Sequence, residues 1–150
     1  MPYPFQDTDL ENPAHPSNCN QLIRTEREAE RIWHPDTPLF EQVENELVNK
    51  CLASREEKCG LIAVEEQDIY YIDNIHHEPN HNFLMSQSEF KMVVAEIYGQ
   101  QEDKVLGIFH THPNNVPWPT PRDLAGWPNP ALRWRYWIAT RHEVIEWSLI

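Results

Sequence analysis

The chain has 150 residues, which suggests one domain with a short appendage and enough length to bury a hydrophobic core. Its 24 acidic residues outnumber its 12 basic ones and give a formal net charge of −12, so its surface repels nucleic-acid phosphates. The three cysteines form no Cys-x-x-Cys pair, which argues against a disulfide framework and fits a reducing compartment.

The chain has no apolar run of the roughly 18–20 residues that cross a bilayer. Its first residues also lack the basic and apolar regions of a secretory signal. We therefore expect a cytoplasmic protein with no membrane or nucleic-acid partner, and a virion-associated protein encoded by a phage would have the same features. The sequence does not define an oligomeric state.

The first half of the chain predicts an arm, a helix and two strands. Residues 1–38 read as an N-terminal extension, because residues 1–20 are rich in Pro, Asn and Asp and residues 21–34 fit either a short helix or a strand with a turn. Apolar residues at helical spacing predict an amphipathic helix over 39–53. Two strands, 59–64 and 69–75, are joined by an acidic turn, and a polar loop covers 76–82.

The second half predicts a helix, a strand, a short helix and two more strands. Ser88 is the expected N-cap of the first helix, which ends near Gly99. A strand over 105–109 leads into a loop rich in Pro and Asn, and Thr120 is the expected cap of a short helix that starts with Pro121. The strands 134–139 and 144–149 close the chain. This order predicts an α/β (α+β) sandwich with a mixed sheet.

Two histidines and one aspartate form the strongest candidate metal site. His110 and His112 stand at a strand end, where residues i and i+2 share a face and can reach one ion together. Asp123 follows eleven residues later and can return to the same point through the stiff intervening loop. Three protein ligands leave one tetrahedral position for water, as in catalytic zinc sites.

A metallohydrolase also needs a base close to the metal, and a carboxylate suits this role. Glu57 is the best candidate because it stands at the entrance to the apolar strand at 59–64, and Glu56 is its obvious rival. Thr120 can offer a hydroxyl to a developing oxyanion.

Simpler interpretations of these residues stay open at this point. Thr120 and Asp123 fit a capping box, which is compatible with metal binding by Asp123. Cys59 is best interpreted as a buried small hydrophobe. The cluster of His76, His77 and His81 is best interpreted as part of a polar loop. Trp118 fits a core position and a substrate groove equally well.

Three blocks of sequence resemble the JAMM motif of the JAB/MPN family of zinc metalloproteases. They are Glu-Lys-Cys-Gly-Leu at 57–61, His-Thr-His-Pro at 110–113 and Thr-Pro-Arg-Asp at 120–123. The resemblance covers roughly residues 39–150 and is closest to short prokaryotic or phage members. One departure is a Thr at position 120, where the family usually has Ser.

The resemblance implies a mixed β-sheet flanked by helices, with cytidine-deaminase-like layering. It also implies that His110, His112 and Asp123 bind Zn²⁺, that Glu57 carries the proton, and that Thr120 stabilises the oxyanion. The implied activity is cleavage of the C-terminal tail of a ubiquitin-like protein or a related peptide bond. Two alternatives stay open, a phage tail-assembly or cell-wall peptidase and a non-catalytic MPN scaffold.

Overall fold

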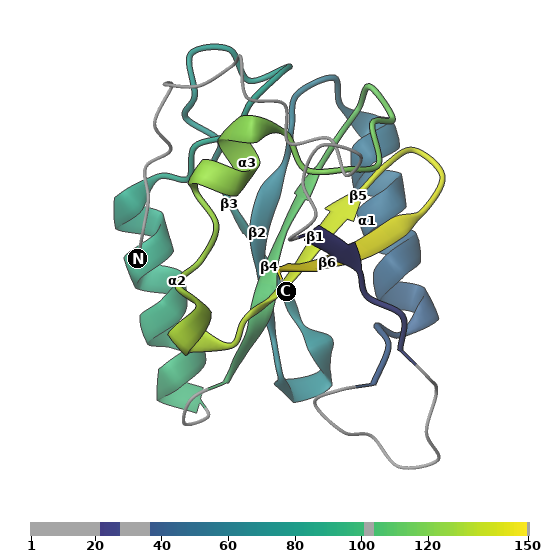
Figure 1. The fold of residues 1–150 in the computed structure, drawn as a ribbon. Coiled ribbons are helices and arrows are strands. Elements are labelled where there is room, and N and C mark those ends of the chain that lie inside the picture. Colours follow the sequence, from purple (N-terminus) through teal and green to yellow (C-terminus); the bar gives the residue numbers. More distant parts are fainter. Residues whose placement is uncertain (1–21, 28–36, 101–103, 150) are drawn as a thin grey trace.

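A six-stranded mixed sheet forms the centre of the fold (Figure 1). The computed structural model describes residues 22–27, 37–100 and 104–149. The strands are β1 (Leu22–Arg24), β2 (Cys59–Ala63), β3 (Ile69–Ile72), β4 (Val105–Thr111), β5 (Arg135–Ala139) and β6 (Val144–Leu149). The helices are α1 (Glu41–Ala53), α2 (Gln87–Gln100) and α3 (Pro121–Ala125), with short 3-10 turns η1 (Glu65–Gln67) and η2 (Pro130–Leu132).

The strand order is β1-β6-β5-β4-β2-β3, and within it β4 and β5 pair in parallel while the other neighbours are antiparallel. Helices α1 and α2 cover opposite faces of the sheet (Figure 1). Val43 and Leu47 of α1 pack on the face that holds Phe109 and Trp137. Helix α2 packs on the other face, so a mixed sheet is flanked by helices, as the family resemblance implies.

The first two helices begin in different ways. The Gln67 side chain accepts the Phe40 N–H at 2.7 Å and donates to the Pro38 carbonyl at 3.2 Å, which fixes the chain just before α1. The prediction of Ser88 as the cap of α2 is wrong. Ser86 precedes the helix, and its hydroxyl accepts the Glu89 N–H at 3.4 Å while its carbonyl accepts the first helical bond.

Two strand boundaries differ from the sequence prediction by more than one residue. Strand β3 ends at Ile72 instead of residue 75, because the chain turns at Asn74 into a loop. Strand β4 continues to Thr111, because β2 and β5 pair with His110 on its two sides. Within residues 21–34, the described part forms β1, which pairs with β6, and the predicted arm at 1–20 lies outside the described residues.

No helix in the described ranges is long and apolar enough to cross a bilayer.

Candidate metal centre

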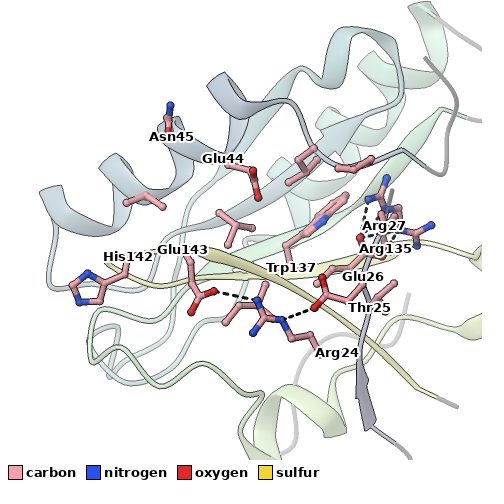
Figure 2. A pocket seen from close by; sticks show the side chains of 16 residues that line it. Arg24, Thr25, Glu26, Arg27, Glu44, Asn45, Arg135, Trp137, His142 and Glu143 are labelled. Atoms are coloured by element: carbon pink, nitrogen blue, oxygen red, sulfur yellow. Dashed lines mark hydrogen bonds and ion pairs between the residues drawn. The ribbon is translucent and has the colours of Figure 1, made fainter. Parts of the chain in front are cut away.

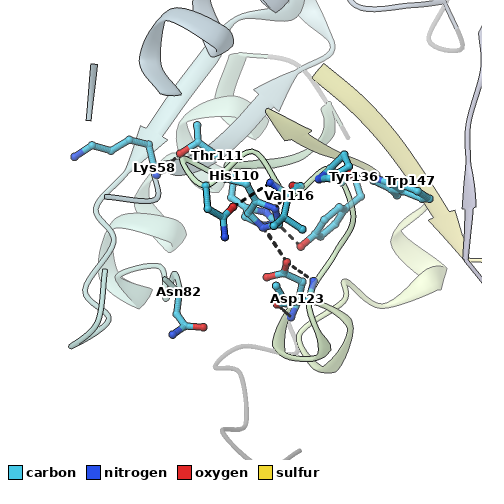
Figure 3. Close-up of polar contacts among 12 residues, drawn as sticks. Lys58, Asn82, His110, Thr111, Val116, Asp123, Tyr136 and Trp147 are labelled. Atoms are coloured by element: carbon cyan, nitrogen blue, oxygen red, sulfur yellow. Dashed lines mark hydrogen bonds and ion pairs between the residues drawn. The ribbon is translucent and has the colours of Figure 1, made fainter. Parts of the chain in front are cut away.

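The two histidines lie at the carboxyl end of β4, and the ring of His110 faces Asp123 (Figure 3). His110 is the sixth residue of the strand and His112 follows its last residue, so both project from one face. Their Nε2 atoms are 2.9 Å apart, and the two residues are 0% and 1% exposed. The structure therefore brings together the pair that the sequence predicts.

Asp123 joins the histidines from α3. Its Oδ2 lies 3.2 Å from Nε2 of each histidine. The same Oδ2 accepts the Thr120 N–H at 2.8 Å, while Thr120 Oγ1 accepts the Asp123 N–H at 3.2 Å. This reciprocal capping box fixes the start of α3 and aims the carboxylate at the histidines.

Contacts behind the histidines hold their rings. Nδ1 of His112 lies 2.7 Å from the Val116 carbonyl and must donate a hydrogen bond to it. The other ring nitrogen, Nε2, therefore faces His110 Nε2 and Asp123 Oδ2. The His110 ring stacks on Phe83 with 4.3 Å between ring centroids, and its Nδ1 is 3.4 Å from the Tyr136 hydroxyl. Orientation of this kind is what a pre-formed metal site requires.

The loop between β4 and α3 is fixed at several points. Asn115 adopts a positive φ of 65°, donates its N–H to the His112 carbonyl and accepts the Arg141 N–H on its side chain at 2.8 Å. The Trp147 indole donates to the Pro117 carbonyl at 2.8 Å. These contacts return the chain to the histidines, as the interpretation of this loop requires.

Glu57 lies beside the histidines just before β2. It is 4% exposed, and one carboxylate oxygen lies within 4.8 Å of a ring nitrogen of both His110 and His112. Its Oε1 is buried and has no hydrogen-bond partner among the described residues. Glu56 is exposed and lies 3.5 Å from the Lys58 ammonium, so the geometry favours Glu57 over its rival.

The four side chains perturb one another electrostatically. Burial raises the pKa of Glu57 to about 8; the charge of His112 opposes this shift and that of Asp123 adds to it. Burial also lowers the pKa of His110. For His112 burial acts downward, but the hydrogen bond and charge of Asp123 outweigh it and raise the pKa to about 9. The histidines in turn outweigh burial and lower the pKa of Asp123.

The donor set fits a zinc ion. Tetrahedral zinc with bonds of about 2.0–2.1 Å places its ligand atoms about 3.3 Å apart. The separations here are 2.9, 3.2 and 3.2 Å, so His110 Nε2, His112 Nε2 and Asp123 Oδ2 need only a small expansion to share one ion. The buried, unpartnered Oε1 of Glu57 is a further sign that a polar group belongs in this space.

Cys59, the loop histidines and Trp118 have structural positions and do not join the metal centre. Cys59 is buried in the core, with its Sγ 3.3 Å from the Ile72 carbonyl. His76 and His77 stack on each other in the loop that follows β3, and His81 is exposed there. Trp118 is half-buried and packs against the core cluster that contains Phe90 and Trp147.

Asn74, Val116 and Tyr136 lie outside the sequence motifs but support the site through their side chains or main chain. Of the three, only Asn74 has a local signal, because an Asp-Asn pair after an apolar strand is typical of a turn. The Val116 carbonyl and the Tyr136 hydroxyl carry no local signal, because their roles depend on how the chain folds back.

A separate pocket of about 440 Å³ lies between α1 and strands β1, β5 and β6 (Figure 2). Its lining includes the buried Glu146, which pairs with Arg27 at 2.6 Å and with Arg135 at 2.7 Å. None of the five predicted site residues lines this pocket.

A mixed sheet between two helices, with two buried histidines at the end of a central strand and an aspartate that α3 brings to them, is the arrangement of a JAB/MPN-type domain. A family model described as prokaryotic homologs of the JAB domain matches residues 41–150, and the chain belongs to this family. Among solved structures, one from Desulfitobacterium hafniense is similar, with 24% identity and a TM-score of 0.42 over 63% of this chain and 66% of that one. A search of curated proteins found no match.

Proposed function

We propose that the chain is a zinc-dependent peptidase or isopeptidase that cleaves the C-terminal tail of a ubiquitin-like protein or a related peptide bond. One observation carries the proposal, namely that His110 Nε2, His112 Nε2 and Asp123 Oδ2 converge within 3.2 Å beside the buried carboxylate of Glu57. Membership of the JAB family supports it, because that family includes metallopeptidases.

In this proposal His110, His112 and Asp123 hold the zinc ion through one atom each. When bound, the ion supplies Lewis acidity, which brings the pKa of a water molecule to roughly 7 and polarises the scissile carbonyl. Two imidazoles and one carboxylate would leave room for a water ligand, as three protein ligands do in catalytic zinc sites.

Glu57 is the proposed acid/base. Its carboxylate accepts a proton from the attacking water and donates it to the nitrogen of the leaving amine as the C–N bond breaks. Thr120 Oγ1 accepts a hydrogen bond in the capping box, so its hydroxyl hydrogen is free to donate elsewhere. In this proposal the hydroxyl donates to the carbonyl oxygen of the substrate.

The proposed substrate is an extended peptide that adds a strand to the sheet. Strand β3 is an edge strand, and its Ile72 pairs with Cys59, two residues after Glu57. A tail that pairs with this edge would enter beside the metal centre with its side chains alternating between two faces.

The test is zinc-dependent cleavage by purified protein, with Glu57→Gln and Glu56→Gln as a matched pair. We expect Glu57→Gln to keep the fold and the bound zinc but to abolish turnover, while Glu56→Gln behaves like the wild type because Glu56 is exposed. Normal cleavage by Glu57→Gln would contradict the assignment of Glu57.

The choice of substrate is tested with a panel of ubiquitin-like fusions and phage structural proteins, each with and without chelator. Cleavage confined to phage or cell-wall substrates would replace the ubiquitin-like tail by the alternative substrate class with the same site. A protein that contains no zinc and takes none up would instead be a non-catalytic scaffold.

A further inference from the structure

Asn74 organises the loop that follows β3 through five hydrogen bonds of one side chain, the longest of which runs from its Nδ2 to the Pro79 carbonyl at 3.5 Å. Its Oδ1 accepts the N–H groups of His76 and Leu84 at 3.0 and 2.9 Å. Its Nδ2 donates to the carbonyls of Glu57 and Asn82, both at 2.9 Å. An amide side chain can accept two bonds at its oxygen and donate two from its nitrogen, so Asn74 uses this capacity in full.

The same loop holds the main chain of Glu57 on both sides. The Glu57 N–H donates to the Pro79 carbonyl at 2.7 Å, and the Glu57 carbonyl accepts Nδ2 of Asn74. The next residue, Lys58, is bound to Thr111 of β4 by its N–H and its carbonyl, each at 2.8 Å. The main chain of Glu57 is therefore clamped between the loop and the strand that carries His110.

The carboxylate of Glu57 has no equivalent support of its own. Its Oε1 is buried without a hydrogen-bond partner among the described residues. The direction of the side chain is thus set by the main chain from which it starts and by packing. A main-chain shift at Glu57 would move the carboxylate relative to the two histidines, and a displacement of about 1 Å in an active site can cost about 100-fold in rate.

We infer that Asn74 is a positioning residue, which holds the Glu57 main chain so that its carboxylate faces His110 and His112. The inference rests on the proposed function, since it assigns Asn74 a role in the same reaction. Asn74 acts through Glu57, and in the described part of the chain its side chain forms no hydrogen bond with His110, His112 or Asp123.

The test compares Asn74→Asp with Asn80→Asp. Asn74→Asp keeps an acceptor for the His76 and Leu84 N–H groups but points an oxygen at the carbonyls of Glu57 and Asn82. Asn80 is exposed in the same loop, so Asn80→Asp adds the same charge without touching these contacts. We expect Asn74→Asp to lower kcat by about 10- to 100-fold, with KM and zinc content within about two-fold of wild type. Asn80→Asp should leave all three unchanged.

A double-mutant cycle separates positioning from a general loss of structure. If Asn74 acts through Glu57, Asn74→Asp changes the residual rate of Glu57→Asp by less than about two-fold, because the shorter side chain has already withdrawn the carboxylate that Asn74 positions. An equal loss of rate in both backgrounds, or an unchanged kcat in Asn74→Asp alone, would overturn the inference. Asn74→Ser, which is neutral and too short to reach Glu57, repeats the test in case the aspartate variant does not fold.

Amide hydrogen exchange provides a readout that needs no activity. We expect the Glu57 amide to exchange at least about 10-fold faster in Asn74→Asp than in Asn80→Asp, because its bond to the Pro79 carbonyl depends on the loop. Equal exchange in the two variants would overturn the inference. Absence of zinc-dependent hydrolysis in the wild type would defeat the proposed function alone, and the exchange result would still decide the positioning role.

Discussion

The Asp123 carboxylate uses one oxygen both to cap a helix and to face two histidines. Oδ2 accepts the Thr120 N–H at 2.8 Å and lies 3.2 Å from each Nε2. Local folding of α3 therefore orients the carboxylate before any metal arrives. This explains how a helix of five residues can deliver a side chain reproducibly to a buried site.

Substitutions of Thr120 separate its two roles. Thr120→Val keeps the shape and the main-chain N–H but removes the hydroxyl, so we expect a loss of about 1 kcal/mol in unfolding free energy from the lost cap. If the hydroxyl also donates to the oxyanion, kcat should fall by about 100-fold, while Thr120→Ser retains both properties. Urea unfolding and steady-state kinetics measure the two effects. Equal kcat in the valine and serine variants would restrict Thr120 to capping.

At the scale of elements, β2 connects the core to the metal centre, and Gly60 shows how closely its neighbours approach. A Cβ added at Gly60 would lie 2.1 Å from the Tyr70 carbonyl oxygen and 2.9 Å from the Phe109 ring. The first of these contacts is with main chain, so a side chain here must push β2 away from β3. The strand begins two residues after Glu57, which links its position to the site.

Gly60→Ala and Gly99→Ala therefore have opposite expected effects. Gly60→Ala should lower the unfolding free energy by about 1–3 kcal/mol through overpacking. Gly99 lies in α2 with no atom within 4 Å of an added Cβ, and Gly99→Ala should raise stability by about 0.5–1 kcal/mol through helix propensity. Urea unfolding monitored by tryptophan fluorescence measures both. A neutral Gly60→Ala would show that β2 can shift without cost.

Strand β6 carries a buried charge that joins three segments of the chain. Glu146 is 7% exposed and pairs with Arg27 after β1 and with Arg135 of β5. Arg135 also donates to the Thr37 carbonyl at 2.8 Å. Removing the carboxylate takes from the buried Arg135 a charge that pairs with it at 2.7 Å. The penalty for breaking such a pair exceeds what the pair itself contributes.

We expect Glu146→Gln to lower the unfolding free energy by about 3–5 kcal/mol. Glu143 offers a matched control, because its pair with Arg24 is about half exposed on both sides. Glu143→Gln should cost less than about 1 kcal/mol. Thermal and urea unfolding of the two variants give the comparison, and similar losses in both would contradict the importance assigned to burial.

The sequence patterns predict the parts of the fold that depend on local spacing. The apolar period over 39–53 predicts α1, and the motif residues His110, His112 and Asp123 predict which side chains meet. The cap of α2 is misassigned by two residues, since Ser86 and Ser88 carry the same local signal and the turn at 73–86 decides between them. The pairing of β1 with β6 is not predictable locally, because a three-residue strand gains its partner only from the assembled sheet.

At the scale of the whole molecule, the metal centre links folding stability to pH. In the metal-free protein, the contributions of Glu57 and His112 to stability are complete below their ordinary pKa values, 4.5 and 6.5. They are lost as pH rises through their folded values, about 8 and 9. His110 and Asp123 have lowered pKa values, so their contributions are already complete above pH 6.5. The stability of the metal-free fold is therefore expected to fall as the pH rises from 6.5 to 9.

Zinc should reverse this trend, because its ligands bind only after they lose their protons. At a zinc concentration about 100 times the dissociation constant, binding adds about 2.7 kcal/mol, or about 5–10 °C in Tm for a domain of this size. We expect the difference in Tm between zinc-loaded and chelated protein to widen from pH 6.5 to 9. His112→Ala should remove the difference at every pH, because it deletes a ligand but not the fold around β4. A difference that is constant with pH would mean that zinc binds without displacing protons from His112, contrary to the geometry in which its Nε2 faces the other donors.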